Sequence, residues 1–191
     1  MKNEFKEAGF NLAELPDYFG EGRGAIKRLM EGSENIGAII LDVDINLNFA
    51  KMYKAALCLK RSDVLFLAGA TDEKLLLGPN TFLIGPRYYL KIIEDFTGRE
   101  PLVFGKPSFH LGKYISKKFN IIDASRTLFV GDSLETDMKF ASLCGYQKMF
   151  VSTGVTKLDD MLRCKDKQMI PDYYLNSLGD LSQLIKDKLN I

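Results

Sequence analysis

The sequence predicts an α/β fold with parallel strands. Short apolar segments alternate with segments of about 10–15 residues that have helical periodicity, a pattern typical of βαβ units. With 46% hydrophobic and 27% charged residues in a chain of 191, the protein can bury a core and is not disordered. One large domain or two small ones are therefore expected.

The amino-terminal part begins with an amphipathic helix at 2–10 that Gly9 closes, followed by a Pro/Gly-rich connector at 15–24. A phosphate-binding loop is not expected in this connector, because no buried strand precedes Gly20 and no Walker-type Lys-Ser/Thr follows. Apolar runs and 3.6-residue periodicity then predict the next elements. In chain order they are a strand at 36–44, a helix at 48–60, a strand at 63–69, a helix at 86–98 and a strand at 101–105.

The carboxyl-terminal part continues the alternation. In chain order we expect a helix at 109–120, a strand at 127–132, a helix at 136–145, a strand at 148–153 and a helix at 178–190. The sequence shows no internal repeat and no low-complexity tract.

Charge, cysteine and histidine content exclude several classes of function. The 26 basic and 25 acidic residues leave a net charge of +1, so neither nucleic acid nor a membrane surface is expected as a partner. Cys58, Cys144 and Cys164 form no CxxC pair, which fits reduced thiols and argues against structural zinc. The single histidine, His110, excludes a His-rich metal site and is expected on a helix surface. Because no signal segment or membrane span is visible, a cytoplasmic location is expected.

Asp132 and Asp137 are the candidate metal ligands. In "TLFVGDSLETDM" (127–138), Asp132 ends an apolar strand and Asp137 falls in the first turn of the following helix. Ligands of open parallel sheets bind beyond the carboxyl ends of the strands, and two carboxylates that face one cation suit Mg²⁺. A purely structural alternative, in which Asp132 ends a strand and Asp137 caps a helix, remains open from this spacing alone.

Lys106 is the candidate cation for catalysis and for substrate binding. It follows the strand end at Gly105, and Pro107 can start the next helix. At the same sheet edge as Asp132, its ammonium group could neutralise a phosphate or a nucleophilic carboxylate. A lone lysine at a strand end is more often simply solvated, but its pairing with a later GDxxxxD favours the functional interpretation.

Several of these motifs resemble one family. "GKPS" (105–108), the stretch 127–138, "STGVTKLDDM" (152–161) and "PDYYLNSLGDL" (171–181) resemble the carboxyl half of the haloacid dehalogenase superfamily, in its phosphoglycolate phosphatase and 4-nitrophenylphosphatase branch. The stretch 38–60 is similar to the cap domain of that branch. The resemblance implies a partial doubly wound parallel sheet, a Rossmann-like half core, with an α/β cap domain. It divides the chain into a core remnant and connector at 1–35, a cap at 36–104 and the carboxyl-terminal half of the core at 105–191.

The same resemblance implies Mg²⁺-dependent hydrolysis of a small phosphorylated metabolite. In such phosphatases an aspartate attacks the phosphoryl group, an aspartyl-phosphate forms, and Mg²⁺ steadies the charge. Matched onto this chain, Lys106 would be the catalytic and substrate-binding lysine, Asp132 a Mg²⁺ ligand, and Asp137 the acid that supports both the metal and catalysis. The family's DxDGT nucleophile motif is not matched before the cap. We therefore expect a truncated chain that is inactive alone and self-associates through an exposed sheet edge or the cap.

Two other interpretations stay open. "IILDVDIN" (39–46) superficially copies the missing motif, so a capless phosphatase or receiver domain would use Asp42 as nucleophile, Asp44 as acid/base and Thr71 as phosphate ligand. Against it, no Gly-Thr or Gly-Ser follows Asp44. The third interpretation is a non-catalytic binding or regulatory protein on a truncated phosphatase fold.

Overall fold

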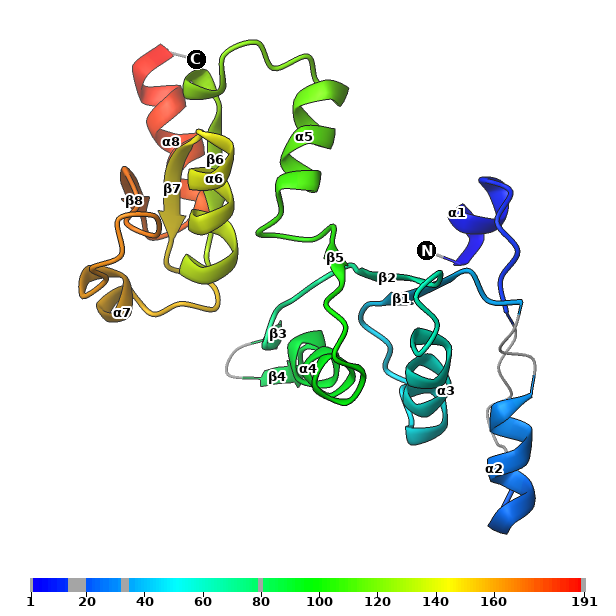
Figure 1. Cartoon of the computed structure of the whole chain (residues 1–191). Coiled ribbons are helices and arrows are strands. Elements are labelled where there is room, and N and C mark those ends of the chain that lie inside the picture. Colours follow the sequence, from blue (N-terminus) through cyan, green and yellow to red (C-terminus); the bar gives the residue numbers. More distant parts are fainter. Residues whose placement is uncertain (1, 14–19, 32–34, 79–80, 190–191) are drawn as a thin grey trace.

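A computed structural model describes residues 2–13, 20–31, 35–78 and 81–189 (Figure 1). The helices are α1 (Lys2–Glu7), α2 (Gly22–Met30), α3 (Phe49–Leu59), α4 (Pro86–Thr97), α5 (Phe109–Lys118), α6 (Lys139–Cys144), α7 (Leu158–Leu162) and α8 (Leu178–Leu189). The strands are β1 (Ala38–Leu41), β2 (Leu65–Ala68), β3 (Lys74–Gly78), β4 (Thr81–Ile84), β5 (Leu102–Val103), β6 (Leu128–Gly131), β7 (Gln147–Val151) and β8 (Tyr173–Leu175). A 3₁₀ turn lies at Ala124–Arg126 and a π-helical turn at Leu134–Met138.

The first parallel sheet has the order β1-β2-β5. Helices α3 and α4 pack on it, and their buried side chains form its core together with those of β2. Arg99 fixes the end of α3, because its guanidinium donates hydrogen bonds to the carbonyls of Leu59, Arg61 and Val64 at 2.9–3.1 Å. Such bonds satisfy carbonyl groups that a helix end leaves without partners.

An antiparallel hairpin of β3 and β4 follows β2. Its apolar side chains are largely exposed, with Leu77 at 63% and Ile84 at 76% of full exposure. The start of α4 holds the beginning of the hairpin, since the backbone N–H groups of Gly85 and Arg87 donate to the carbonyls of Glu73 and Asp72.

The second parallel sheet has the order β6-β7-β8. The central strand β7 is the most buried, with Met149, Phe150 and Val151 in the interior. On one side of the sheet, Phe140 of α6 packs against Phe129 of β6 with ring centroids 5.2 Å apart. Helix α5 carries the chain from the first sheet to the second, as Figure 1 shows.

The predicted α/β class and parallel strands are confirmed, and each strand and helix expected from the sequence lies in its predicted range apart from small shifts at the ends. Gly9 follows α1 with φ +83°, as expected of a residue that ends a helix. His110 is exposed on α5, as predicted. Within the described residues, no helix is both long and apolar enough to cross a membrane.

The prediction of the elements was incomplete at α2, at the hairpin of β3 and β4, at α7 and at β8, and the five residues of α7 are too few to show helical periodicity. The connector at 15–24 lies partly outside the described residues, and its last residues open helix α2, because the glycines occur only in the first turn and good helix formers follow. The hairpin of β3 and β4 was missed because the run Leu75–Leu77 does not alternate with polar residues. Strand β8 was missed because it is only three residues long.

Strand β6 is an edge, since among the described strands it pairs only with β7. An apolar parallel strand with an open edge offers unpaired backbone groups to other chains. We predict that the protein self-associates through this edge and that Leu128→Lys shifts it toward monomer in sedimentation velocity. The control is Ile122→Lys, at a side chain that is 92% exposed in the preceding loop. A chain that stays monomeric at all concentrations, or an equal effect of both variants, would contradict this prediction.

Candidate active site

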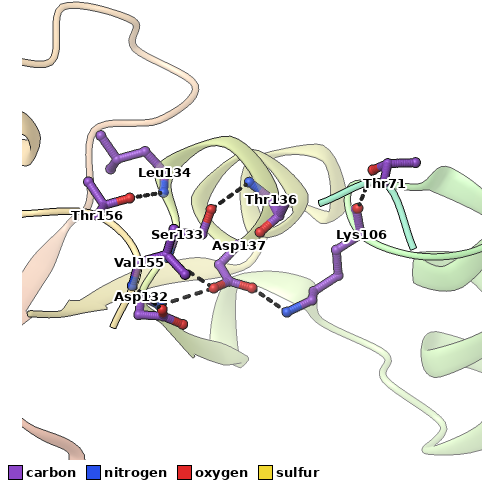
Figure 2. A network of polar contacts seen from close by, with 9 residues as sticks. All are labelled: Thr71, Lys106, Asp132, Ser133, Leu134, Thr136, Asp137, Val155 and Thr156. Atoms are coloured by element: carbon purple, nitrogen blue, oxygen red, sulfur yellow. Dashed lines mark hydrogen bonds and ion pairs between the residues drawn. The ribbon is translucent and has the colours of Figure 1, made fainter. Parts of the chain in front are cut away.

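Lys106 and Asp137 form an ion pair that joins the two parallel sheets. Lys106 follows β5, Asp137 lies in the π-helical turn after β6, and Nζ is 2.5 Å from Oδ1 (Figure 2). The Asp137 side chain is only 4% exposed, whereas that of Lys106 is 41% exposed. The lysine also lies over the ring of Phe129, 5.9 Å from its centroid. A buried carboxylate needs such partners, because burial without them is costly.

The π-helical turn aims Asp137 back at the end of β6. The backbone N–H groups of Asp137 and Met138 both donate to the carbonyl of Ser133, at 3.0 and 3.1 Å, and the second of these is an i to i+5 bond. In this turn, Asp137 Oδ2 accepts hydrogen bonds from the N–H groups of Asp132 and Ser133 at 3.0 and 3.1 Å. Both carboxylate oxygens of Asp137 are therefore bound within the protein.

Two glycines make room for the two carboxylates. A Cβ atom at Gly131 would overlap the carboxyl group of Asp137, and one at Gly154 would overlap that of Asp132. Gly131, the glycine of the Gly-Asp pair, therefore has a steric function, since it lets the carboxyl group of Asp137 lie over the strand end. Neither position would accept another residue without a shift of the carboxylate.

Asp132 is held by the loop after β7. Its Oδ2 accepts a hydrogen bond from the N–H of Val155 at 2.6 Å, and its backbone carbonyl accepts one from the N–H of Thr156 at 3.1 Å. The hydroxyl of Thr156 in turn accepts from the N–H of Leu134 at 3.2 Å. Of the four carboxylate oxygens on Asp132 and Asp137, only Asp132 Oδ1 has no hydrogen bond from a described residue.

The loop after β2 contacts the site at Lys106. The hydroxyl of Thr71 donates to the carbonyl of Lys106 at 3.1 Å, and Gly105 lets the two strand ends approach, because a Cβ there would overlap the carbonyl of Gly69. Burial raises the pKa of Asp72 in this loop, Lys106 opposes the rise, and the charges of Asp137 and Asp132 add to it. Asp72 is thus an electrostatic neighbour of all three predicted site residues.

The structure brings Lys106, Asp132 and Asp137 together, but from two separate sheets and not from the single sheet edge that was expected, because β5 and β6 do not pair. Asp42 does not join them. Asp42 ends β1, which is separated from β5 by β2, and strands two apart in a sheet lie about 10 Å from each other. Its Oδ1 accepts from the N–H groups of Val43 and Ala70. Among the described residues, no hydrogen bond or ion pair joins Asp42 to the other three. This arrangement does not support Asp42 as the nucleophile of a capless enzyme.

The site fits part of a magnesium shell. Mg²⁺ prefers oxygen ligands and commonly takes one or two carboxylates together with water and phosphate oxygens. Of the carboxylate oxygens of Asp132 and Asp137, Asp132 Oδ1 is the one that could face a cation, and Asp137 holds the strand end beside it. The described part of the chain contains no group of three or more His, Cys, Asp or Glu side chains that could hold a metal ion. Any cation bound here needs further ligands from substrate, solvent or another chain.

Two parts of the site were missed from the sequence. Asp72 follows a predicted strand, as does Thr71, which was considered only as the phosphate ligand of a capless enzyme, and the sheet edge that both share with Lys106 is a signal that could have placed Asp72 near the site. Val155 and Thr156 follow a predicted strand in the same way, but no pattern shows that the loop they share folds onto Asp132.

Comparison with known proteins gives consistent results. The family model of HAD-hydrolase-like proteins matches residues 103–181. Human chronophin is 32% identical over 190 residues, which are 98% of this chain and 60% of that protein. The chain therefore spans about 60% of the length of this curated relative.

Solved structures show the same similarity. A 4-nitrophenylphosphatase from Thermotoga maritima superposes with a TM-score of 0.73 at 26% identity, over 95% of this chain and 60% of that one. A glycerol phosphate phosphatase from Mycobacterium tuberculosis, solved in complex with magnesium, has a TM-score of 0.66 at 25% identity, over 78% of this chain and 43% of that one.

We predict that Lys106→Ala lowers the free energy of unfolding by about 1–2 kcal/mol, because it leaves the buried charge of Asp137 with only backbone donors. The measurement is urea denaturation at neutral pH. Lys139→Ala is the matched control: Lys139 is also 41% exposed, but it pairs at 3.6 Å with Glu135, which is 72% exposed. Exposed pairs of this kind contribute less than about 1 kcal/mol. Equal losses of unfolding free energy in the two variants would show that the buried ion pair stabilises the fold no more than an exposed one.

Proposed function

Because this chain belongs to the haloacid dehalogenase superfamily, in its phosphoglycolate phosphatase and 4-nitrophenylphosphatase branch, we propose that it carries the phosphate-binding and metal-binding half of a phosphate-monoester hydrolase. Residues 36–104 would be its cap and residues 105–191 the carboxyl-terminal half of its catalytic core. The substrate would be a small phosphorylated metabolite in the cytoplasm.

The observation that carries this proposal is the position of Lys106. Its ammonium group is fixed against Asp137 yet 41% exposed, so it can approach an anion without leaving its partner. A lysine has three N–H donors, of which the pair with Asp137 uses one. The others can donate to phosphate oxygens and neutralise charge that develops during phosphoryl transfer.

The metal would be held through Asp132, with Asp137 as the residue that positions it. When bound there, Mg²⁺ would supply charge neutralisation for the phosphate oxygens. Asp137 has no carboxylate oxygen left for the metal in this arrangement, since Oδ1 accepts a hydrogen bond from Lys106 and Oδ2 accepts two from backbone N–H groups. The two carboxylates thus have separate functions: Asp132 faces the cation, and Asp137 orients both Lys106 and the end of β6.

A complete reaction needs an attacking group. Positioning of phosphate and metal without a nucleophile forfeits the covalent step that divides the hydrolysis into two easier ones. Among the described residues, both carboxylate oxygens of Asp137 accept hydrogen bonds, the open oxygen of Asp132 is assigned above to the metal, and Asp42 follows a strand two away from β5. We therefore propose that this 191-residue chain does not turn over alone and acquires activity when a segment with a DxDGT strand docks beside it.

We expect no Mg²⁺-dependent hydrolysis of 4-nitrophenyl phosphate by the isolated chain above a Lys106→Ala, Asp132→Asn double variant. Addition of a separately expressed amino-terminal segment that bears DxDGT should produce turnover, and the same segment with its first aspartate changed to asparagine should not. Steady-state assays with purified components provide the measurement.

Three outcomes would contradict the proposal in different ways. Activity of the isolated chain that disappears in Asp42→Asn would establish a capless phosphatase. Activity that survives Asp42→Asn would require a nucleophile not considered above. A folded complex with the amino-terminal segment that remains inert would favour a non-catalytic binding or regulatory protein.

A further inference from the structure

Among the described residues, three hydrogen bonds attach the loop after β7 to the segment 132–134, and Thr156 takes part in two of them. The N–H of Thr156 donates to the carbonyl of Asp132 at 3.1 Å, and its hydroxyl oxygen accepts from the N–H of Leu134 at 3.2 Å (Figure 2). The third bond runs from the N–H of Val155 to Asp132 Oδ2 at 2.6 Å. Thr156 therefore holds the backbone on both sides of Ser133, and the residue before it holds the carboxylate.

The Thr156 hydroxyl satisfies a donor at the start of the π-helical turn. The first N–H groups of a helical segment have no partner within that segment. Leu134 is the first residue of this turn and is buried, so its N–H needs an acceptor from elsewhere in the protein. The hydroxyl oxygen of Thr156 is that acceptor. A valine at this position would have a similar shape but no acceptor, and the bond that ties the loop to the turn would be lost.

The backbone of the same loop covers one oxygen of the Asp132 carboxylate. Gly154 lies against this oxygen, because a Cβ atom at Gly154 would overlap Asp132 Oδ2. The hydrogen bond from Val155 reaches the same atom. Oδ2 is therefore turned toward the loop, and a cation would meet Asp132 through Oδ1 alone.

A carboxylate that offers a single fixed oxygen suits a small cation better than a large one. Mg²⁺ requires a nearly ideal octahedral shell with short bonds, and one oxygen held in place fits such a shell. Ca²⁺ accepts more oxygens in a flexible shell and can take both oxygens of one carboxylate. If the loop released Asp132, the second oxygen would become available to Ca²⁺.

We propose that Thr156 is a positioning residue for the metal. By holding the loop after β7 against Asp132, it restricts this carboxylate to one oxygen and so favours Mg²⁺ over Ca²⁺. Thr156 acts through Asp132 and is not itself a ligand. This inference rests on the metal site of the proposed function. It goes beyond that site, because it names the residue that sets how Asp132 binds and the cation that this arrangement disfavours.

Displacement of Mn²⁺ from the intact chain tests this inference without any need for turnover. Electron paramagnetic resonance measures the bound Mn²⁺, and its displacement by Mg²⁺ or by Ca²⁺ gives the affinity for each cation. The wild-type chain should prefer Mg²⁺. Thr156→Val should weaken Mg²⁺ binding about tenfold, the lower end of what the loss of a group that orients a metal ligand costs. Because Ca²⁺ binding should change less, the ratio of the two affinities should fall.

Three further variants isolate the hydroxyl and the carboxylate. Thr156→Ser keeps the acceptor and should keep the wild-type ratio. Thr153→Val makes the same chemical change at an exposed residue of the same loop, so it is the matched control and should also keep the ratio. Gly154→Ala acts on the carboxylate directly, since its Cβ would displace Oδ2, and should lower the ratio although the Thr156 hydroxyl is present. It keeps the test valid if Thr156→Val does not fold.

The outcomes separate this inference from the function on which it rests. Mn²⁺ binding that Asp132→Asn abolishes, together with a ratio that Thr156→Val leaves unchanged, would overturn the assignment of Thr156 alone. A wild-type preference for Ca²⁺, or an equal fall of the ratio in Thr153→Val, would overturn it as well. Failure of Mn²⁺ to bind to the wild-type chain would overturn the metal site and the inference together.

Discussion

The ion pair of Lys106 and Asp137 is the constraint on which the rest of the site depends. It connects the segment after β5, in the first parallel sheet, to the turn after β6, in the second. A buried aspartate is stable only when donors surround it, and here Lys106 and two backbone N–H groups supply them. The need for these donors explains the π-helical turn and the glycine at 131, because both bring Asp137 over the strand end.

Asp132 and Asp137 carry the same carboxylate group but differ in their hydrogen bonds and burial. Asp137 is enclosed and fully hydrogen-bonded, so its negative charge holds Lys106 and the strand end. Asp132 Oδ2 accepts a hydrogen bond from the backbone N–H of Val155, and its Oδ1 accepts none from a described residue, which is why the proposed function assigns the cation to it. The open edge of β6 lies next to both. In the described residues, this place in the fold combines an open strand edge with the two carboxylates. Under the proposed function, one docked strand would pair with β6 and bring the nucleophile.

The sequence predicted the parts of the fold and of the site that depend on local pattern. Apolar strands such as 127–132 and amphipathic helices such as 86–98 were found because their spacing is strong. Lys106 and Asp132 were expected at one edge of a single sheet, whereas β5 and β6 belong to two different sheets and the two residues reach the site from separate sheet ends. The ion pair was not predictable, since it depends on a π-helical turn that no residue pattern marks. Asp72 was missed although it follows β2, the neighbour of β5 in the same sheet, so the shared sheet edge could have placed it near Lys106.

A crystal structure of the chain with tungstate and Mn²⁺, which scatter anomalously and replace phosphate and Mg²⁺, would test the account most directly. The central claim is that Lys106 and Asp132 form a phosphate-binding and metal-binding half-site. It predicts a tungstate peak within hydrogen-bonding distance of Lys106 Nζ and a manganese peak at Asp132 Oδ1, both absent from Lys106→Ala, Asp132→Asn crystals. Tungstate bound elsewhere, for example at the glycine-rich start of α2, with no anion or metal beside Lys106 and Asp132, would contradict it.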